Sequence, residues 1–297
     1  MKTIQRAARP RGPAYSLEFP GKSVAVVRMD VPKARDWEQW FLIRADVHHD
    51  NPHSDRALEK KHLEQAKERG AGVLSIGDTF CAMQGKYDKR SDKSCLRPEH
   101  QHGDYLDRLV TTAADFYEPY AHHLILFGEG NHESAIRKRH ETDLLERLAQ
   151  TLRDRTGAKV CPGGYSGWVR FMFTLRGAQR LSRRLFYHHG YGGGGPVTLD
   201  TIQGQRIRAY VDADYIVTGH THDSWQVRTM KVSLNDANRV EHRTIRTVKC
   251  TTYKDEYGQG EGGFHIETGK PPKPLGAWWL RFTVTGQRLT DEWFEAV

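Results

Sequence analysis

The stretch Leu124-Ile125-Leu126-Phe127-Gly128-Glu129-Gly130-Asn131-His132-Glu133 decides the fold. Its apolar half predicts a short buried strand, and Asn131 and His132 follow the carboxyl end of that strand. In open α/β sheets this edge is where binding and catalytic sites are built. Taken alone, the stretch could also be a turn with a helix cap. The other polar clusters of the chain decide between this interpretation and a functional site.

Four further apolar strands are predicted, and each leads into side chains that can bind a metal ion. The strands are 37–45, 73–76, 185–188 and 215–218, and the clusters at their ends are Asp46 with His48, Asp78, His188 with His189, and His220 with His222. The helical composition of 54–69, between the first two strands, favours a parallel crossover. The sequence therefore predicts an α/β fold with polar clusters gathered at one edge.

Two of these clusters have the patterns Asp-x-His and His-x-His. In an extended chain residues two apart point to the same face, so both members of each pair are expected to reach one centre. A mixture of carboxylate, imidazole and amide oxygen suits Mn²⁺, Fe or Zn²⁺ better than the all-oxygen sites of Ca²⁺. Each cluster alone has an ordinary alternative, such as a helix-capping Asp46 or a turn at Asp78. The occurrence of all five directly after strands favours a metal site.

The rest of the chain predicts an extended N-terminal arm at 1–20 and a single domain at 21–297. Further strands are predicted at 23–30 and 168–175, helices at 99–120, 141–155 and 198–211, and a polar loop or lid at 81–98. Two hairpins, 225–234 with 240–251 and 278–285 with 287–295, make 223–297 a β-rich part that completes a second sheet.

Length and composition are those of a soluble globular enzyme. Of the 297 residues, 37% are hydrophobic and 28% are charged, and no apolar run reaches the roughly 20 residues that span a bilayer. The N-terminus lacks the apolar core of a secretory signal, and the four cysteines form no CxxC pair. We therefore expect a cytoplasmic protein with free thiols and no membrane association. A zinc knot is the alternative for four residues: Cys81, Cys95, His100 and His102.

The net charge of +8 suggests attraction to polyanions such as nucleic acid. The alternative is that the basic residues are spread over a solvated surface. The sequence does not predict the oligomeric state.

The order Asp46-x-His48, Gly77-Asp78, Gly130-Asn131-His132-Glu133, His189-Gly190 and Gly219-His220-x-His222 resembles the calcineurin-like metallophosphoesterase superfamily. This resemblance implies a four-layer α/β/β/α sandwich with two central mixed β-sheets. It also implies a dinuclear metal centre bridged by Asp78. The coordination of one metal ion would be completed by Asp46, His48 and His222. That of the other would be completed by Asn131, His189 and His220. His132 would not be a ligand but would protonate the leaving oxygen or steady the phosphoryl group.

The activity that the resemblance implies is phosphoester hydrolysis, by a phosphatase or a phosphodiesterase. Two metal ions would neutralise the phosphate oxygens and turn a bridging water into hydroxide, and a histidine suits protonation of the departing oxygen. Mn²⁺ is the expected metal, with Fe, Zn²⁺ or Ni²⁺ as alternatives. The Ser/Thr protein phosphatase branch is not expected, because Thr79-Phe80 follows Asp78 and the last motif has two histidines. His189 is favoured over His188 because the family's ligand precedes a glycine.

Candidate substrate contacts are His49, Asp50 and Arg137, which lie near the metal motifs in sequence. The loop 81–98, the glycines 192–195 and Trp278-Trp279 are candidate borders of the pocket. Two other functions stay open. One is a DNA or RNA nuclease of the same superfamily, favoured by the positive charge, and the other is a non-catalytic scaffold or nucleic-acid-binding module.

Overall fold

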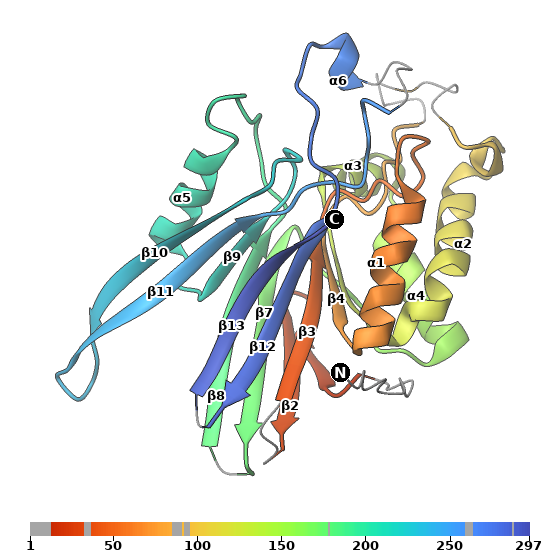
Figure 1. The fold of residues 1–297 in the computed structure, drawn as a ribbon. Helices are drawn as coiled ribbons and strands as arrows, with labels where there is room; N and C mark the ends of the chain where they lie inside the picture. Colours follow the sequence, from red (N-terminus) through yellow and green to blue (C-terminus); the bar gives the residue numbers. More distant parts are fainter. Residues whose placement is uncertain are drawn as a thin grey trace, which may run out of the picture.

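Two β-sheets pack face to face between layers of helices in the computed structural model of this chain (Figure 1). The structure describes residues 13–32, 37–84, 91, 96–177, 179–258, 264–286 and 288–297. Both sheets mix parallel and antiparallel pairs. The predicted four-layer α/β/β/α sandwich with two central mixed sheets is therefore confirmed.

The six-stranded sheet carries the strands predicted to lead into the first three motifs. Its order is β13 (Arg288–Ala296), β12 (Ala277–Thr285), β3 (Trp37–Arg44), β4 (Gly72–Ile76), β5 (Leu124–Gly128) and β6 (Cys161–Pro162). Strands β3 to β6 are parallel, whereas β12 runs antiparallel to β3 and β13. Because β3, β4 and β5 are parallel, the loops that follow them leave the sheet at one edge.

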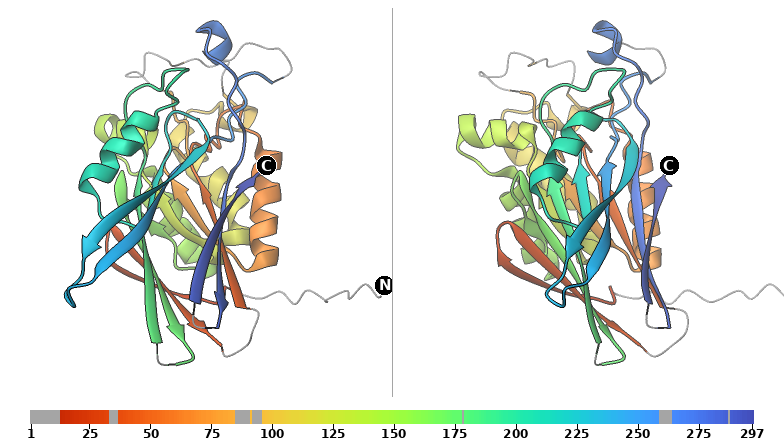
Figure 2. Two further views of the ribbon diagram at one scale, coloured as in Figure 1. Left: turned by 60° about the vertical axis from the view of Figure 1, so that its left-hand side comes forward. Right: turned by 90° about the vertical axis from the view of Figure 1, so that its left-hand side faces the viewer.

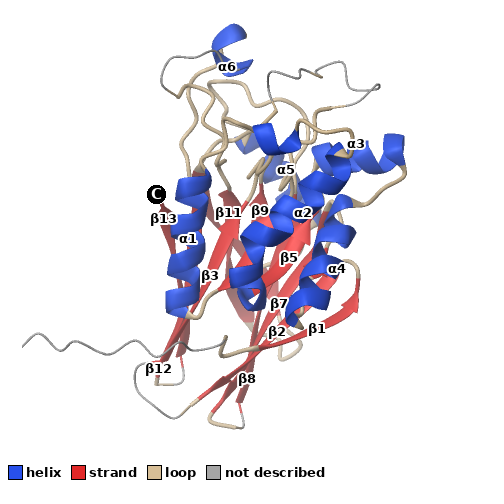
Figure 3. Ribbon diagram, turned by 90° about the vertical axis from the view of Figure 1, so that its right-hand side faces the viewer, coloured by secondary structure: helices blue, strands red, loops and turns tan. Residues whose placement is uncertain are grey.

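The seven-stranded sheet carries the last two motifs. Its order is β1 (Ser16–Gly21), β2 (Val24–Val31), β7 (Ser166–Leu175), β8 (Gln179–His188), β9 (Tyr215–Thr218), β11 (Val240–Lys249) and β10 (Trp225–Leu234). Strands β8 and β9 are parallel, with His188 opposite Thr218, so their carboxyl ends also lie together. Figure 3 shows the connecting loops gathered at one end of the sandwich, beneath α6 (Phe264–Glu267).

Side chains that alternate along the strands fill the layers between sheets and helices. Phe41 and Ile43 of β3 lie in the core between the two sheets, where the ring of Phe41 packs 4.7 Å from that of Phe171. Leu42 points the other way, into the core beneath the helices. Every second residue of a strand therefore faces the opposite layer, as strand geometry requires.

Helices cover both outer faces of the paired sheets. Helices α1 (Arg56–Arg69), α2 (Tyr105–Tyr117) and α4 (Leu144–Thr156) pack on the six-stranded sheet. Helix α5 (Thr201–Tyr210) packs on the seven-stranded sheet, at the opposite side of the molecule (Figure 2). No helix among the described residues is long and apolar enough to cross a membrane.

Two predicted segments differ from the structure, and one helix of the structure was not predicted. The expected N-terminal arm ends in β1, which pairs with β2, because Leu17 and Phe19 pack against the core. The segment 99–120 is not one helix but η2 (Pro98–His100), α2 and η3 (Glu118–His123), because Gly103 and Pro119 interrupt it. Helix α3 (Asn131–His140) was not predicted. Most of the predicted loop 81–98 lies outside the described residues.

Candidate metal centre

Two groups of ligand atoms lie at the loop end of the sheets. Asp46, His48 and His222 form the first group, and Asp78, His189 and His220 form the second. Within each group the ligand atoms lie no more than 4.8 Å apart. The structure thus brings together six of the seven predicted metal ligands, from four separate loops, in the two sets that the resemblance implies.

The two groups adjoin each other. Asp46 Oδ1 lies 3.4 Å from His222 Nε2 in its own group and 4.0 Å from His189 Nε2 in the other. Asp78 Oδ2 lies 3.1 Å from the same His189 nitrogen. The side chains of Asp46 and His189 are completely buried. The carboxylates therefore face one shared space rather than two separate ones.

Asn131, the seventh predicted ligand, joins the second group. Its Oδ1 lies 2.8 Å from His220 Nδ1 and 3.1 Å from His189 Nε2. His220 Nε2 lies 2.9 Å from the carbonyl oxygen of Gly192. A neutral imidazole has a single ring proton, so His220 can donate to only one of these two oxygens. A cation beside Asn131 Oδ1 would satisfy the remaining nitrogen.

The first group contains buried polar atoms that lack a hydrogen-bond partner. These atoms are Asp46 Oδ1, His48 Nδ1 and His222 Nδ1. In addition, the Nε2 atoms of His48 and His222 face each other at 3.3 Å, where at most one proton can lie between them. Buried polar atoms are almost always paired, so this set needs an explanation. A divalent cation bound by Asp46 Oδ1 and the two Nε2 atoms fits this donor set, and it leaves His48 Nδ1 without a partner.

The second group is charged in the absence of metal. Burial lowers the pKa of His189, but the carboxylate of Asp78 outweighs this effect and raises it to about 9. Burial favours the neutral form of Asp78, yet His189 and His132 hold its pKa well below the ordinary value. A metal ion that binds here must displace the proton of His189, so metal affinity should rise with pH.

Burial is the dominant influence on the pKa of two other imidazoles. It lowers the pKa of His48 well below its ordinary value, and it also lowers that of His220. Both rings are therefore neutral near pH 7, which is the form that binds a metal.

Five of the candidate ligand residues have positive φ angles, in the left-handed region of backbone conformation. The φ angles are 52° at Asp46, 49° at His48, 51° at Asp78, 81° at His220 and 60° at His222. The prediction that Asp-x-His and His-x-His converge by extended alternation is therefore wrong, although the side chains do converge. Such conformations are costly for residues other than glycine and occur at functional sites.

Backbone hydrogen bonds hold these loops against one another. Asp46 N donates to Gly77 O and His48 N donates to Asp78 O, both at 3.0 Å, so the loops after β3 and β4 are joined. His220 N donates to Asp46 Oδ2 at 2.8 Å, which joins the two sheets. These hydrogen bonds hold the loops that carry the candidate ligands against one another.

Two glycines allow close approach to the carboxylates. A Cβ atom at Gly130 would lie 2.0 Å from Asp78 Oδ1, and one at Gly219 would lie 2.6 Å from Asp46 Oδ2. Neither distance is compatible with a side chain. The glycines of Gly-Asn-His and Gly-His-x-His are thus required by packing against the ligands themselves.

Glu133 organises the loop after β4 without reaching the ligands. Its carboxylate accepts hydrogen bonds from Asp78 N at 3.2 Å, Phe80 N at 2.9 Å and Gly130 N at 2.9 Å. Burial and the charge of Asp78 raise the pKa of Glu133 to about 8. These three bonds fix the start of α3 against the turn that carries Asp78.

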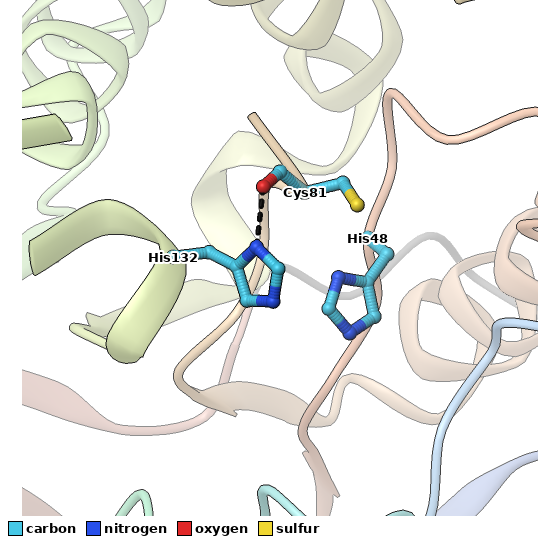
Figure 4. Close-up of side chains that lie close together, drawn as sticks. All are labelled: His48, Cys81 and His132. Carbon is cyan, nitrogen blue, oxygen red and sulfur yellow. Dashed lines mark hydrogen bonds between the residues drawn. The ribbon is translucent and has the colours of Figure 1, made fainter. Parts of the chain in front are cut away.

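His132 stands at the edge of the centre. Its Nδ1 lies 2.5 Å from the carbonyl oxygen of Cys81 (Figure 4). Because a carbonyl only accepts, Nδ1 carries the proton, and Nε2 is directed at Asp78 Oδ2, 3.8 Å away. His132 thus presents one defined nitrogen toward the metal groups.

A cavity of about 610 Å³ opens over both groups. It is lined by predicted residues, including His132, Asn131 and Gly192 to Gly194, and by Cys81 at the start of the predicted border loop 81–98. Sequence reasoning missed other lining residues, among them Lys254 and His265, which come from distant segments without a motif. Trp278 and Trp279 do not border the cavity, because both side chains are buried in the cores.

The three predicted substrate contacts lie differently. His49 points away from the cavity, with Nδ1 2.8 Å from Glu59 Oε2 in a buried cluster. Arg137 pairs with Glu129 at 2.8 Å and does not line the cavity. Asp50 does line it, but its carboxylate accepts hydrogen bonds from the backbone nitrogens of Cys81 and Ala82. The structure therefore gives no support to substrate contacts by His49 or Arg137.

The alternative zinc knot is not assembled among the residues that the structure describes. His100 is buried and lies 2.9 Å from Thr112 Oγ1, whereas His102 is exposed. Cys95 lies outside the described ranges. Cys81 is instead grouped with His48 and His132.

Comparison with known proteins does not assign a family. No family model matches the sequence, and no curated protein matches it. Solved structures with some likeness include Vps29 of Entamoeba histolytica complexed with Zn²⁺, at 10% identity and a TM-score of 0.33, covering 87% of this chain and 100% of that one. Vps29 of Cryptosporidium parvum is 14% identical with a TM-score of 0.32, covering 88% and 98%.

A third similar structure is GAP50, the anchor in the inner membrane complex of Plasmodium. It is 11% identical, with a TM-score of 0.38, covering 87% of this chain and 85% of that one. None of these likenesses assigns a function to this chain.

Proposed function

We propose that this chain is a metal-dependent phosphoester hydrolase. The observation that carries the proposal is the pair of adjoining ligand groups, with Asp46 Oδ1 4.0 Å from His189 Nε2 and His132 directed at the same space. The motif order that resembles the calcineurin-like metallophosphoesterases supports it independently. When bound, two divalent ions, Mn²⁺ being our first candidate, would neutralise phosphate oxygens and activate water as the nucleophile.

Residues of the chain hold the metal ions in position and supply the proton for the leaving oxygen. Asp46 and Asp78 provide the negative charge that holds cations in a buried space. In its imidazolium form, with Nδ1 donating to the carbonyl of Cys81, His132 donates the Nε2 proton to the departing oxygen. Lys254 lines the same cavity, where it forms an ion pair with Glu256.

A substrate panel tests the proposal. The chelator-treated protein is supplied with Mn²⁺ and offered a nitrophenyl phosphate monoester, the bis-ester, and single- and double-stranded DNA. We expect hydrolysis of the small esters, and Asp78→Asn as the matched variant should abolish it together with metal binding. Arg137→Ala serves as a control, because Arg137 does not line the cavity.

The panel also separates the alternatives. Cleavage of DNA with a steep dependence on salt would identify a nuclease, which the charge of +8 would assist. If metal is demonstrably bound and no substrate is hydrolysed, the proposed enzymatic function is refuted. That result would favour a scaffold or binding module.

A further inference from the structure

We propose that Cys81, together with His48 and His132, forms a separate binding site for a thiophilic divalent ion such as Zn²⁺ or Cd²⁺. One ligand atom from each of the three residues lies within 4.8 Å of the other two. Figure 4 shows the rings of His132 and His48 next to each other, with the backbone oxygen of Cys81 above His132 and its sulfur above His48. The site is distinct from the two carboxylate-containing groups, although it shares His48 with the first of them.

The environment of Cys81 favours this arrangement. The side chain is buried, and Asn51 Nδ2 donates to its sulfur at 3.3 Å, which fixes the thiol at the cavity wall. The backbone nitrogen of Cys81 donates to Asp50 Oδ1 at 2.5 Å, so the main chain is held as well. The sulfur is therefore directed to one place rather than sampling several.

The two imidazoles each have a nitrogen to offer. His48 is only 2% exposed, and its Nδ1 has no hydrogen-bond partner. His132 uses Nδ1 to donate to the carbonyl of Cys81, which leaves Nε2 available. An unpartnered buried nitrogen beside a fixed sulfur is an unusual arrangement that a bound cation would explain.

The ligand set decides which cation is favoured. One sulfur and two imidazole nitrogens suit Zn²⁺ and its softer analogue Cd²⁺, whereas Mn²⁺ prefers oxygen ligands. On binding, the Cys81 thiol proton passes to solvent, a metal–sulfur bond forms, and the fourth position of a tetrahedral site is left for water. No oxidation takes place.

Binding at this site has a consequence for the proposed function, on which this step rests. The ion would occupy Nε2 of His132, the nitrogen assigned to protonate the leaving oxygen. It would also engage His48, a ligand of the first group. Zn²⁺ in excess should therefore inhibit the Mn²⁺-loaded protein through Cys81.

Cd²⁺ titration of the full, chelator-treated chain tests the binding step without any need for activity. The charge-transfer absorption of a Cd–thiolate bond should appear in the ultraviolet and saturate at one thiolate per chain. Cys81→Ser should abolish it, whereas Cys95→Ser, Cys161→Ser and Cys250→Ser should each retain it. His132→Ala should weaken Cd²⁺ binding by about 10-fold or more. Equal absorption in Cys81→Ser, or none in the unchanged protein, would overturn the proposal.

Inhibition is measured separately. Each variant is compared with its own rate before Zn²⁺ is added, so a change in basal rate does not matter. We expect the concentration of Zn²⁺ that halves the Mn²⁺-dependent rate to rise at least about 10-fold in Cys81→Ser. Equal sensitivity of the two proteins would refute the inhibitory role. If the unchanged protein hydrolyses nothing, the proposed function fails, while the Cd²⁺ result still decides the site.

Discussion

The backbone nitrogen of His132 donates a hydrogen bond to Asp78 Oδ1 at 3.0 Å, while Nε2 of the same residue lies 3.8 Å from Asp78 Oδ2. The first turn of α3 is thus tied to the carboxylate that also pairs with His189. The position of the proposed acid is therefore set by the residue proposed to hold the metals.

Replacement of His132 by Asn should separate metal binding from turnover. We expect His132→Asn to retain bound Mn²⁺ but to lose about 10²- to 10⁴-fold in kcat, because proton transfer to the leaving oxygen is removed. The loss should be larger for an alkyl phosphate than for a nitrophenyl phosphate, whose leaving oxygen needs no proton. An unchanged rate on the alkyl ester would show that His132 is not the acid.

Gly130→Ala should weaken the metal centre without changing the fold. The added Cβ would lie 2.0 Å from Asp78 Oδ1, so the carboxylate has to move. We expect metal affinity to fall by about 10- to 100-fold in calorimetric titration. Gly21→Ala is the matched control, because a Cβ there has no atom within 4 Å. Equal affinities of the two variants would contradict the close packing at Gly130.

The buried cluster around Glu59 should govern acid stability. Burial disfavours its charge, but His49 and Arg44 outweigh this effect and lower the pKa of Glu59 to about 2. A carboxyl whose pKa is lower in the folded state stabilises the fold above its unfolded pKa, and this contribution is lost as pH falls toward about 2. The contribution near pH 7 is roughly 3 kcal/mol.

The corresponding variant is Glu59→Gln. It leaves the guanidinium of Arg44 buried without its 2.7 Å partner, so the free energy of unfolding in urea should fall by about 3–5 kcal/mol. The double variant Arg44→Met/Glu59→Gln should lose less than Glu59→Gln alone, because the unpaired charge is gone. A double variant less stable than the single one would refute this explanation.

Arg137→Ala should have little effect on catalysis. The guanidinium pairs with Glu129 at 2.8 Å, and about half of the side chain is exposed. We expect kcat/KM on the nitrophenyl ester to change by no more than about 2-fold, as for most surface substitutions. A decrease above about 10-fold would return Arg137 to the substrate contacts.

The sequence was sufficient for the strands and for the edge of the sheets at which the candidate ligands lie. Apolar runs such as Leu124 to Gly128 are short, end at glycine, and lead into polar side chains, so both the strand and the edge it meets could be predicted. Parallel pairing then brings Asp46, Asp78 and Asn131 together. Hydrophobic patterning and turn chemistry agree at these positions, which is why the prediction succeeded.

The sequence was insufficient where side-chain direction depends on irregular backbone. His48 and His49 are neighbours, yet one joins the metal groups and the other enters the cluster with Glu59. Left-handed φ angles at Asp46 and His48 decide this, and no periodicity encodes them. The place of Cys81 likewise depends on how Glu133 and Asp50 bind the loop after Asp78.

The most direct test of a metal-dependent phosphoesterase combines two readouts on one sample. The protein is stripped with a chelator, Mn²⁺ is added in steps, and bound metal and hydrolysis of nitrophenyl phosphate esters are measured together. We expect hydrolysis to be absent at first, to rise as metal binds, and to saturate at two ions per chain, with both signals lost in Asp78→Asn. Full hydrolysis by the stripped protein, or none with both ions bound, would contradict the proposed function.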